Sequence, residues 1–199
     1  MIYLASKSPR RTELLSQIGV EHEIIDIEVD EIIDTNQSPQ ENVRALSVLK
    51  CQEGVRKVIM KKKSAFPVLT ADTIVVFEGK IFGKPASESD AIRMLMQLSG
   101  KTHSVITGVT IGVISSKQAK FHTLSVESSV EFTKLDQDDC LKYCKTNESF
   151  DKAGGYGIQG YGSAFVKKIN GSYSNIVGLP IHEVVELFKK LDISYWNKK

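Results

Sequence analysis

The chain has little cysteine, no long hydrophobic run and almost no excess of charge of either sign. Three cysteines in 199 residues are too few for the disulfide framework of a secreted domain. No apolar stretch approaches the roughly 20 residues of a membrane helix, and the N-terminus resembles a strand rather than a signal peptide. With 26 basic and 24 acidic residues, only a local cluster can attract an anion. We therefore expect a cytoplasmic globular protein that binds neither membranes nor nucleic acid.

Motifs for covalent catalysis and for a Walker loop are also missing. None of the four histidines lies in a nucleophile motif, and the stretch Gly100–Thr102 lacks the upstream glycines of a phosphate-binding loop. Cys140 and Cys144 are one helical turn apart, but no histidine or third cysteine lies near enough in sequence to complete a metal site. Any chemistry must therefore come from other residues.

The apolar pattern predicts alternating helices and strands. A capping box at Ser38 and Glu41 starts the longest helix, which the basic run 61–63 ends. We expect Val43, Leu46, Val48 and Leu49 to form its apolar stripe. No repeat or linker divides the chain, so residues 1–199 are expected to form one α/β domain. We expect strands over residues 2–5, 23–29, 67–71, 102–114, 121–133 and 164–169, with 73–77 continuing extended and a short return strand at 81–82. The other helices are expected over 9–18, 87–98, 136–145 and 181–190, and the helix 87–98 should align Ala91, Met94, Leu95 and Leu98 on its inner face.

The N-terminal segment passes from a short apolar run into a helix start that carries two arginines. Ser8 suits the N-cap and Pro9 the first helical position, which places Arg10 and Arg11 in the first turn. Arginine is unfavourable there because the helix dipole is positive at that end, so we expect an anion to compensate. Free backbone N–H groups and two guanidinium groups predict a polyphosphate site. The alternative is a capped helix whose arginines are solvated or paired.

Two acidic and two basic residues extend this hypothesis. Asp72 is expected at the end of an apolar strand, where a carboxylate can bind a metal or polarise water. Glu31 follows another predicted strand and offers a second oxygen ligand for a hard cation such as Mg²⁺. Lys84, on a tight loop, is positioned to meet phosphate as a point charge, and Lys50 lies on the longest helix as a further candidate. Each residue alone fits a turn or surface role better than a functional one, so the prediction depends on their combination.

The stretch from Asp151 to Gly160 contains four glycines in ten residues. Glycine lets a backbone approach a ligand closely, tyrosine can stack on a base, and glutamine can read a base edge. The stretch includes Lys152, Tyr156 and Gln159, and it lacks the strand-turn-helix context of a dinucleotide fingerprint. We interpret it as a nucleotide-binding loop, with a tight structural loop as the alternative.

Six motifs, in order along the chain, resemble those of the Maf family of nucleoside triphosphate pyrophosphatases. They are residues 5–11, 71–73, 83–85, 99–108, 151–160 and 169–180. The resemblance implies an elongated mixed sheet flanked by helices, with two lobes around a central cleft, as in the inosine triphosphate pyrophosphatases. It also implies a homodimer that cleaves between the α and β phosphates, which gives a nucleoside monophosphate and pyrophosphate.

By position, the resemblance also assigns roles to individual residues. Glu31 and Asp72 match an acidic pair that would hold a divalent cation, Mg²⁺ or Mn²⁺, with Asp72 also the proton acceptor. Gln159, together with Arg11 and Thr73, falls where the family sets substrate choice. The expected substrate-binding residues are Ser6, Arg10, Arg11, Lys50, Thr73, Lys84, Lys152 and Gln159.

The late glycine-rich loop is similar to that of the subgroup acting on dTTP and UTP. We therefore expect a house-cleaning pyrophosphatase for these nucleotides or for modified pyrimidine nucleotides. One alternative is pyrophosphohydrolysis of 7-methyl-GTP. The other is a non-catalytic protein that binds nucleotides or nucleic acid and inhibits septum formation and cell division.

Overall fold

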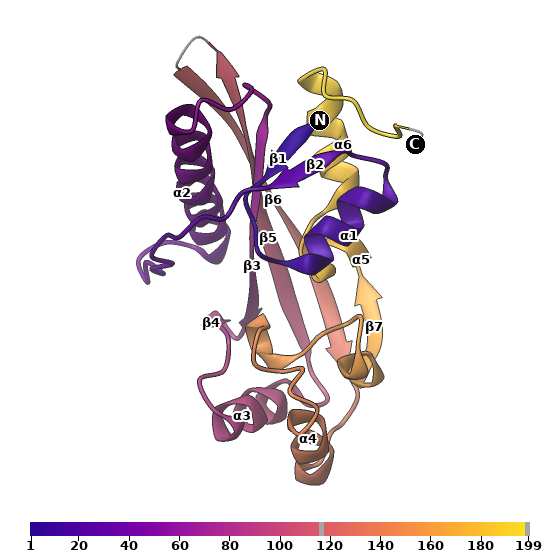
Figure 1. The fold of residues 1–199 in the computed structure, drawn as a ribbon. Coiled ribbons are helices and arrows are strands. Elements are labelled where there is room, and N and C mark those ends of the chain that lie inside the picture. Colours follow the sequence, from indigo (N-terminus) through magenta and orange to yellow (C-terminus); the bar gives the residue numbers. More distant parts are fainter. Residues whose placement is uncertain (116–117, 198–199) are drawn as a thin grey trace. The chain divides into compact units, whose positions relative to one another are not determined.

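The computed structural model describes residues 1–115 and 118–197 and confirms the predicted α/β class (Figure 1). Seven strands form one mixed sheet in the order β2-β1-β3-β5-β6-β7, and β4 pairs with β3 outside this path. The strands are β1 (Ile2–Leu4), β2 (His22–Ile24), β3 (Val68–Phe77), β4 (Lys80–Phe82), β5 (Thr102–Ser115), β6 (Gln118–Phe132) and β7 (Val166–Asn170).

The helices largely follow the predicted ranges. They are α1 (Pro9–Gln17), α2 (Pro39–Met60), α3 (Glu88–Leu98), α4 (Gln137–Cys144), α5 (Tyr173–Val177) and α6 (Ile181–Lys190), with 3₁₀ turns η1 (Ala153–Gly155) and η2 (Tyr161–Phe165). The capping box of Ser38 and Glu41 is present at the start of α2. The short helix α5 was not predicted. Across the described ranges 1–115 and 118–197, no helix combines the length and apolar character needed to cross a bilayer.

The chain divides into two compact units. Unit 1 comprises Met1–Asp72, Thr107–Val126 and Gly178–Lys199, and unit 2 comprises Thr73–Ile106 and Glu127–Val177. Strands β3, β5 and β6 contribute residues to both units, so each unit is built from segments that are distant in sequence.

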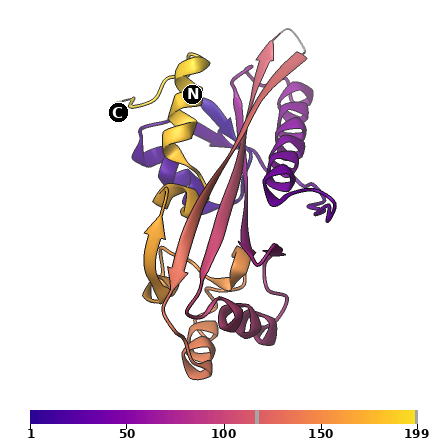
Figure 2. The ribbon, with the colours of Figure 1, turned by 180° about the vertical axis from the view of Figure 1, so that it is seen from behind.

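In unit 1, β1 pairs in parallel with both β2 and β3. Helix α2 covers one face of these strands, and α1 and α6 cover the other (Figures 1 and 2). A side chain at Gly108 of β5 would overlap the backbone carbonyl of Val43, so α2 rests directly on that strand. The core between α2 and the sheet contains Tyr3, Ala5, Ile25, Cys51, Val55, Val58 and Val68.

The predicted strand over residues 23–29 is wrong in length, because β2 ends at Ile24. Its partner β1 ends at Leu4, whose carbonyl oxygen accepts the N–H of Ile25 at 2.9 Å. Beyond this point β1 no longer supplies backbone partners, so an alternating apolar pattern alone does not keep the chain extended.

The predicted apolar stripe of α2 is also partly wrong. Val48 is half-buried and Leu49 is exposed, although both were expected to face the core. Lys50 lies on the buried side of the helix instead. The buried residues of α2 are Asn42, Val43, Leu46, Ser47, Lys50, Cys51, Gly54, Val55 and Val58.

Unit 2 has its own apolar core, to which α3 and α4 both contribute. The predicted inward residues Ala91, Met94, Leu95 and Leu98 of α3 are all buried. The strand expected over residues 164–169 starts at Val166, because the preceding residues form the 3₁₀ turn η2. This core includes Tyr156 of the glycine-rich loop and Phe165 of η2.

Candidate active site

Asp72 lies within β3 and not at the end of a strand, which corrects the prediction. The pairing of β1 with β3 extends to Leu69, where the Ala5 N–H donates to the Leu69 carbonyl at 2.9 Å. The chain from β1 then turns away toward α1, whereas β3 continues to Phe77. Asp72 is therefore held by a rigid strand just beyond the end of its parallel partner.

The ammonium of Lys50 joins the two acidic residues that the sequence singled out. Its Nζ lies 2.5 Å from Oδ1 of Asp72 and 2.9 Å from Oε1 of Glu31. The side chains of Lys50 and Asp72 are 11% and 8% exposed, whereas that of Glu31 is 51% exposed. Glu31 lies in the irregular segment after β2, not directly after a strand as predicted. The two carboxylates thus converge on one buried cation.

The start of α1 adds an arginine that is fixed by hydrogen bonds. Arg11 donates through Nε to the Gly178 carbonyl at 2.8 Å and through Nη1 to Oγ of Ser6 at 3.1 Å. The same Ser6 oxygen accepts the N–H of Ser8 at 3.2 Å. Ser8 occupies the N-cap position as predicted, but its side chain makes no capping bond. Buried Ser6 therefore organises this turn.

Several charged residues of unit 1 affect the pKa of the Arg11 guanidinium. Burial lowers the pKa of Arg11, attraction to Asp72 opposes this shift, and repulsion from Arg10 adds to it. Arginine stays protonated at neutral pH because its ordinary pKa lies far above neutrality. Arg10 is half-buried in the first helical turn, as predicted. The three basic residues here thus outnumber the two carboxylates, which suits a polyanionic ligand.

The predicted residues of unit 2 gather around two adjoining loops. Lys84 is exposed on the loop after β4. The neighbouring Gly83 carbonyl accepts the Gly154 N–H at 3.0 Å, so this loop lies against the glycine-rich one. Gln159 is exposed, and Thr73 is half-buried on β3 directly after Asp72. Unit 2 thereby brings the Lys84 loop and the Gln159 loop together.

Lys152 is engaged by its own loop. Its Nζ lies 2.5 Å from Oδ1 of Asp151 and donates to the Glu148 carbonyl at 2.8 Å. A lysine held by these contacts must exchange at least one of them to meet a phosphate. The expectation that Lys152 binds substrate therefore remains a prediction.

Glu31 and Asp72 fit a divalent cation that is shared with a substrate. Both carboxylates contact the same ammonium, so they lie close enough together to share one ion, which would take the place of that ammonium between them. Within the described part of the chain, no group of three or more His, Cys, Asp or Glu side chains is arranged to hold a metal. Mg²⁺ usually binds through one or two carboxylates and completes its shell with phosphate oxygens and water. The pair meets that requirement.

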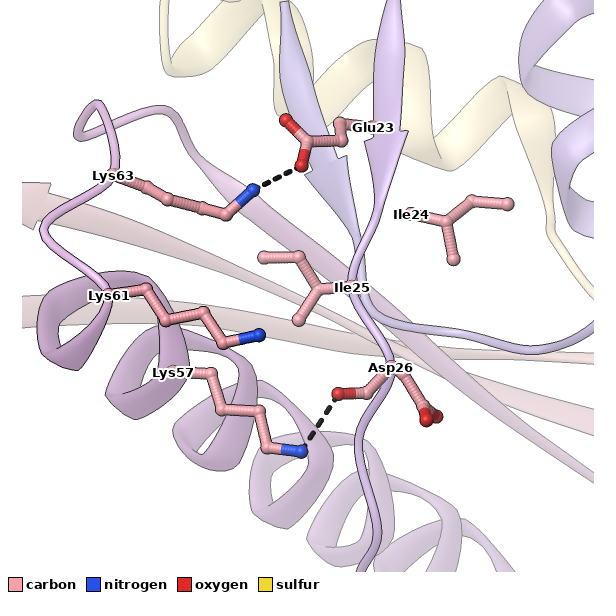
Figure 3. A pocket seen from close by; sticks show the side chains of 7 residues that line it. All are labelled: Glu23, Ile24, Ile25, Asp26, Lys57, Lys61 and Lys63. Atoms are coloured by element: carbon pink, nitrogen blue, oxygen red, sulfur yellow. Dashed lines mark hydrogen bonds and ion pairs between the residues drawn. The ribbon is translucent and has the colours of Figure 1, made fainter.

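A separate hollow of about 380 Å³ lies in unit 1 beside the end of α2 (Figure 3). Lys63 pairs with Glu23, and Lys57 donates to the Asp26 carbonyl at 2.9 Å. The basic run 61–63 therefore contributes contacts within the protein as well as a solvated helix end. The hollow is lined by Glu23, Ile24, Ile25, Asp26, Lys57, Lys61 and Lys63, and these do not include any predicted site residue.

Comparison with known proteins shows the family to which the chain belongs. Residues 1–191 match the family described as Maf-like protein. A dTTP/UTP pyrophosphatase of Caldicellulosiruptor bescii is 44% identical over 190 residues, which cover 96% of this chain and 94% of the relative. A dTTP/UTP pyrophosphatase of Clostridioides difficile is 44% identical over 95% and 94% of the two chains, and one of Ralstonia nicotianae is 43% identical over 97% and 95%. With similarity over nearly its whole length, the chain belongs to the Maf-like protein family.

Proposed function

We propose that this chain is a nucleoside triphosphate pyrophosphatase that hydrolyses dTTP and UTP to the nucleoside monophosphate and pyrophosphate. The observation that carries the proposal is the buried carboxylate of Asp72, which Lys50 holds beside Glu31. The arginines of α1 add positive charge at the same place, as a triphosphate with about four negative charges requires. The names of the relatives support the choice of substrate.

Asp72 is the proton acceptor in this proposal. A water oxygen attacks the α-phosphorus, its proton passes to Asp72, and the bond from that phosphorus to the bridging oxygen breaks. The bonding electron pair leaves with pyrophosphate. A positioned general base contributes typically 10² to 10⁴ in rate, and the rigid strand around Asp72 supplies the positioning.

Glu31 and Asp72 are the residues that would hold Mg²⁺ or Mn²⁺. When bound, such an ion acts as a Lewis acid on the phosphate oxygens. Lys50 contacts both carboxylates and supplies positive charge beside them for the phosphates. In the presence of excess EDTA we expect pyrophosphate release to stop and to return when Mg²⁺ is added.

The remaining residues bind the ends of the substrate. Ser6, Arg10 and Arg11 neutralise and orient phosphate oxygens, and arginine does so with two hydrogen bonds at a time. Lys84 and Lys152 supply further positive charge, and Thr73 with Gln159 selects the base through hydrogen bonds. These assignments rest on the resemblance of the motifs.

The test is a substrate panel of dTTP, UTP, CTP, GTP and 7-methyl-GTP, each with Mg²⁺. We expect pyrophosphate release from dTTP and UTP, with kcat/KM at least tenfold above that for CTP and GTP. A preference for 7-methyl-GTP would place the chain in the other subgroup. Binding without any release would favour the non-catalytic alternative.

We also propose that the protein is a cytoplasmic homodimer. The cysteines Cys51, Cys140 and Cys144 are free and buried, as is usual in a reducing compartment. Burial raises the pKa of Cys51 to about 12, so this thiol is not reactive at neutral pH.

Light scattering tests the dimer, for which the expected mass is about twice 22.1 kDa. A mass of one chain would contradict it.

A further inference from the structure

One carboxylate in unit 2, that of Glu148, holds the glycine-rich loop on the far side of Gln159. Its Oε2 accepts the N–H of Tyr161 at 2.8 Å, and its Oε1 accepts the N–H of Gly162 at 3.1 Å. A carboxylate that accepts two backbone N–H groups makes charge-assisted bonds, which are stronger than neutral ones. The loop backbone just after Gln159 is thus fixed by a residue that precedes the loop in sequence.

Tyr143 extends this contact to the near side of Gln159. Its hydroxyl donates to Oε1 of Glu148 at 3.0 Å and accepts the N–H of Gly157 at 3.1 Å. Burial and the neighbouring Glu148 carboxylate raise the pKa of Tyr143, so the hydroxyl keeps the proton that it donates. Backbone groups on both sides of Gln159 are therefore tied to the pair Tyr143 and Glu148.

The glycine at position 160 is explained by the same carboxylate. A side chain there would overlap the carboxylate of Glu148, so only glycine lets the loop pass so close. The Lys152 ammonium adds a further tie, because it donates to the Glu148 backbone carbonyl at 2.8 Å. Part of the glycine content that suggested close approach of a ligand thus serves the approach of Glu148.

We propose that Glu148 is a positioning residue for base selection, which acts by holding the backbone of residues 157–162 so that Gln159 presents its amide in one place. The inference rests on the proposed function, in which Gln159 contacts the base. Gln159 itself is exposed and carried by a loop, so its orientation depends on how firmly the backbone around it is held. A more mobile loop lowers base selectivity before it lowers the rate of hydrolysis, because Asp72 and its partners belong to unit 1.

The main test is the variant Glu148→Gln. An amide presents an NH₂ group toward one of the N–H donors, so at least one loop contact is lost whichever way the side chain turns. We expect KM for dTTP to rise about tenfold, kcat to stay within about twofold, and the preference for dTTP over CTP to fall about tenfold. The matched control is Glu131→Gln, which removes the same charge in unit 2 from a pair with Lys167 and should change none of these values.

Two further measurements separate positioning from a merely structural role. Gln159→Ala should lose the same preference, and the double variant with Glu148→Gln should lose no more than either single one. Hydrogen exchange of the backbone amides in residues 157–162 should become faster in Glu148→Gln and stay unchanged elsewhere. An unchanged base preference, or an equal fall in kcat for all substrates, would overturn the proposal.

A milder variant keeps the test decisive if Glu148→Gln does not fold. Tyr143→Phe removes only the hydroxyl that Gly157 and Glu148 share, and we expect a rise in KM of about threefold with a smaller loss of preference. If the unaltered chain releases no pyrophosphate, the proposed function fails on its own. Calorimetry of dTTP and CTP binding then reads the selection directly, and equal loss of affinity for both nucleotides would count against Glu148.

Discussion

The ammonium of Lys50 lies 2.5 Å from Oδ1 of Asp72, and both side chains are almost fully buried. A buried ion pair seldom adds net stability, because removing two charges from water costs about as much as their attraction returns. Glu31 shares the same ammonium but stays half exposed. We therefore interpret the ion pair of Lys50 and Asp72 as a contact that orients the Asp72 carboxylate for catalysis.

Asp72→Asn should abolish turnover, because an amide cannot accept the proton of the attacking water. We expect kcat for dTTP to fall by about 10³ or more, with the dissociation constant of the nucleotide within about threefold of the unaltered value. Pyrophosphate release and calorimetry measure the two quantities. Asp30→Asn, an exposed neighbour of Glu31, is the control and should remain active. Hydrolysis retained by Asp72→Asn would refute the role of this residue.

Lys50→Met should destabilise the fold, because it leaves the buried carboxylate of Asp72 without its cation. We expect the free energy of unfolding, measured with urea, to fall by about 3 kcal/mol. Adding Asp72→Asn should recover part of that loss, since the uncompensated charge is then removed as well. The exposed Lys61, mutated to Met, should change stability by less than about 0.5 kcal/mol. Additive losses in the double variant would contradict the coupling.

Gly108→Ala should separate α2 from β5, because the new methyl group would overlap the Val43 carbonyl. We expect a loss of about 2 to 3 kcal/mol in the free energy of unfolding, which urea denaturation measures. Gly83→Ala is the control, since a methyl group there meets nothing within 4 Å. Equal stability of the two variants would show that α2 does not rest on the strand as described.

His103 should make stability depend on pH below neutrality. Burial lowers its pKa to about 4, whereas the unfolded chain protonates it near 6.5. Between these values the unfolded state binds more protons, so stability falls as the pH is lowered from 6.5 to 4. We expect up to about 3 kcal/mol of this loss to vanish in His103→Gln when urea unfolding is compared at pH 7 and pH 4.

The control for this prediction is the exposed His182. Its replacement by Gln should leave the pH dependence of the free energy of unfolding as it is in the unaltered chain. The Tyr156 hydroxyl, which lies 2.8 Å from Nε2 of His103, is buried together with the ring. An unchanged pH dependence in His103→Gln would contradict the burial of this histidine.

Elements with strong local signals were predicted well. The capping box of Ser38 and Glu41 starts α2, and the four apolar residues expected on the inner face of α3 are buried. These signals involve residues within four positions of one another, so they act before any distant contact forms. The position of Arg10 and Arg11 in the first turn of α1 follows from Pro9 in the same way.

The wrong predictions concern features that depend on contacts between residues distant in sequence. The strand expected to reach Val29 stops at Ile24, because β1 beside it is short. Asp72 was placed at a strand end because the apolar run stops there, yet β3 continues to Phe77. The ion pair of Lys50 was missed, although position 50 follows Val43 and Leu46 at helical spacing and so marks the buried face. A lysine at helical spacing from core residues indicates a buried ammonium that pairs with acidic side chains.

The sequence alone determines the helix starts, the α/β alternation and the family motifs. Each of these depends on caps, periodicity or glycine patterns within a short stretch and needs no distant partner. Two features cannot be predicted from such short stretches. One is the contact of Glu31 and Asp72 with Lys50, and the other is the binding of the loop around Gln159 by Glu148. Each of these contacts depends on how helices pack against strands and how loops fold back on helices. Such contacts appear only when packing selects one partner among many acids and amides, and no local pattern makes that selection.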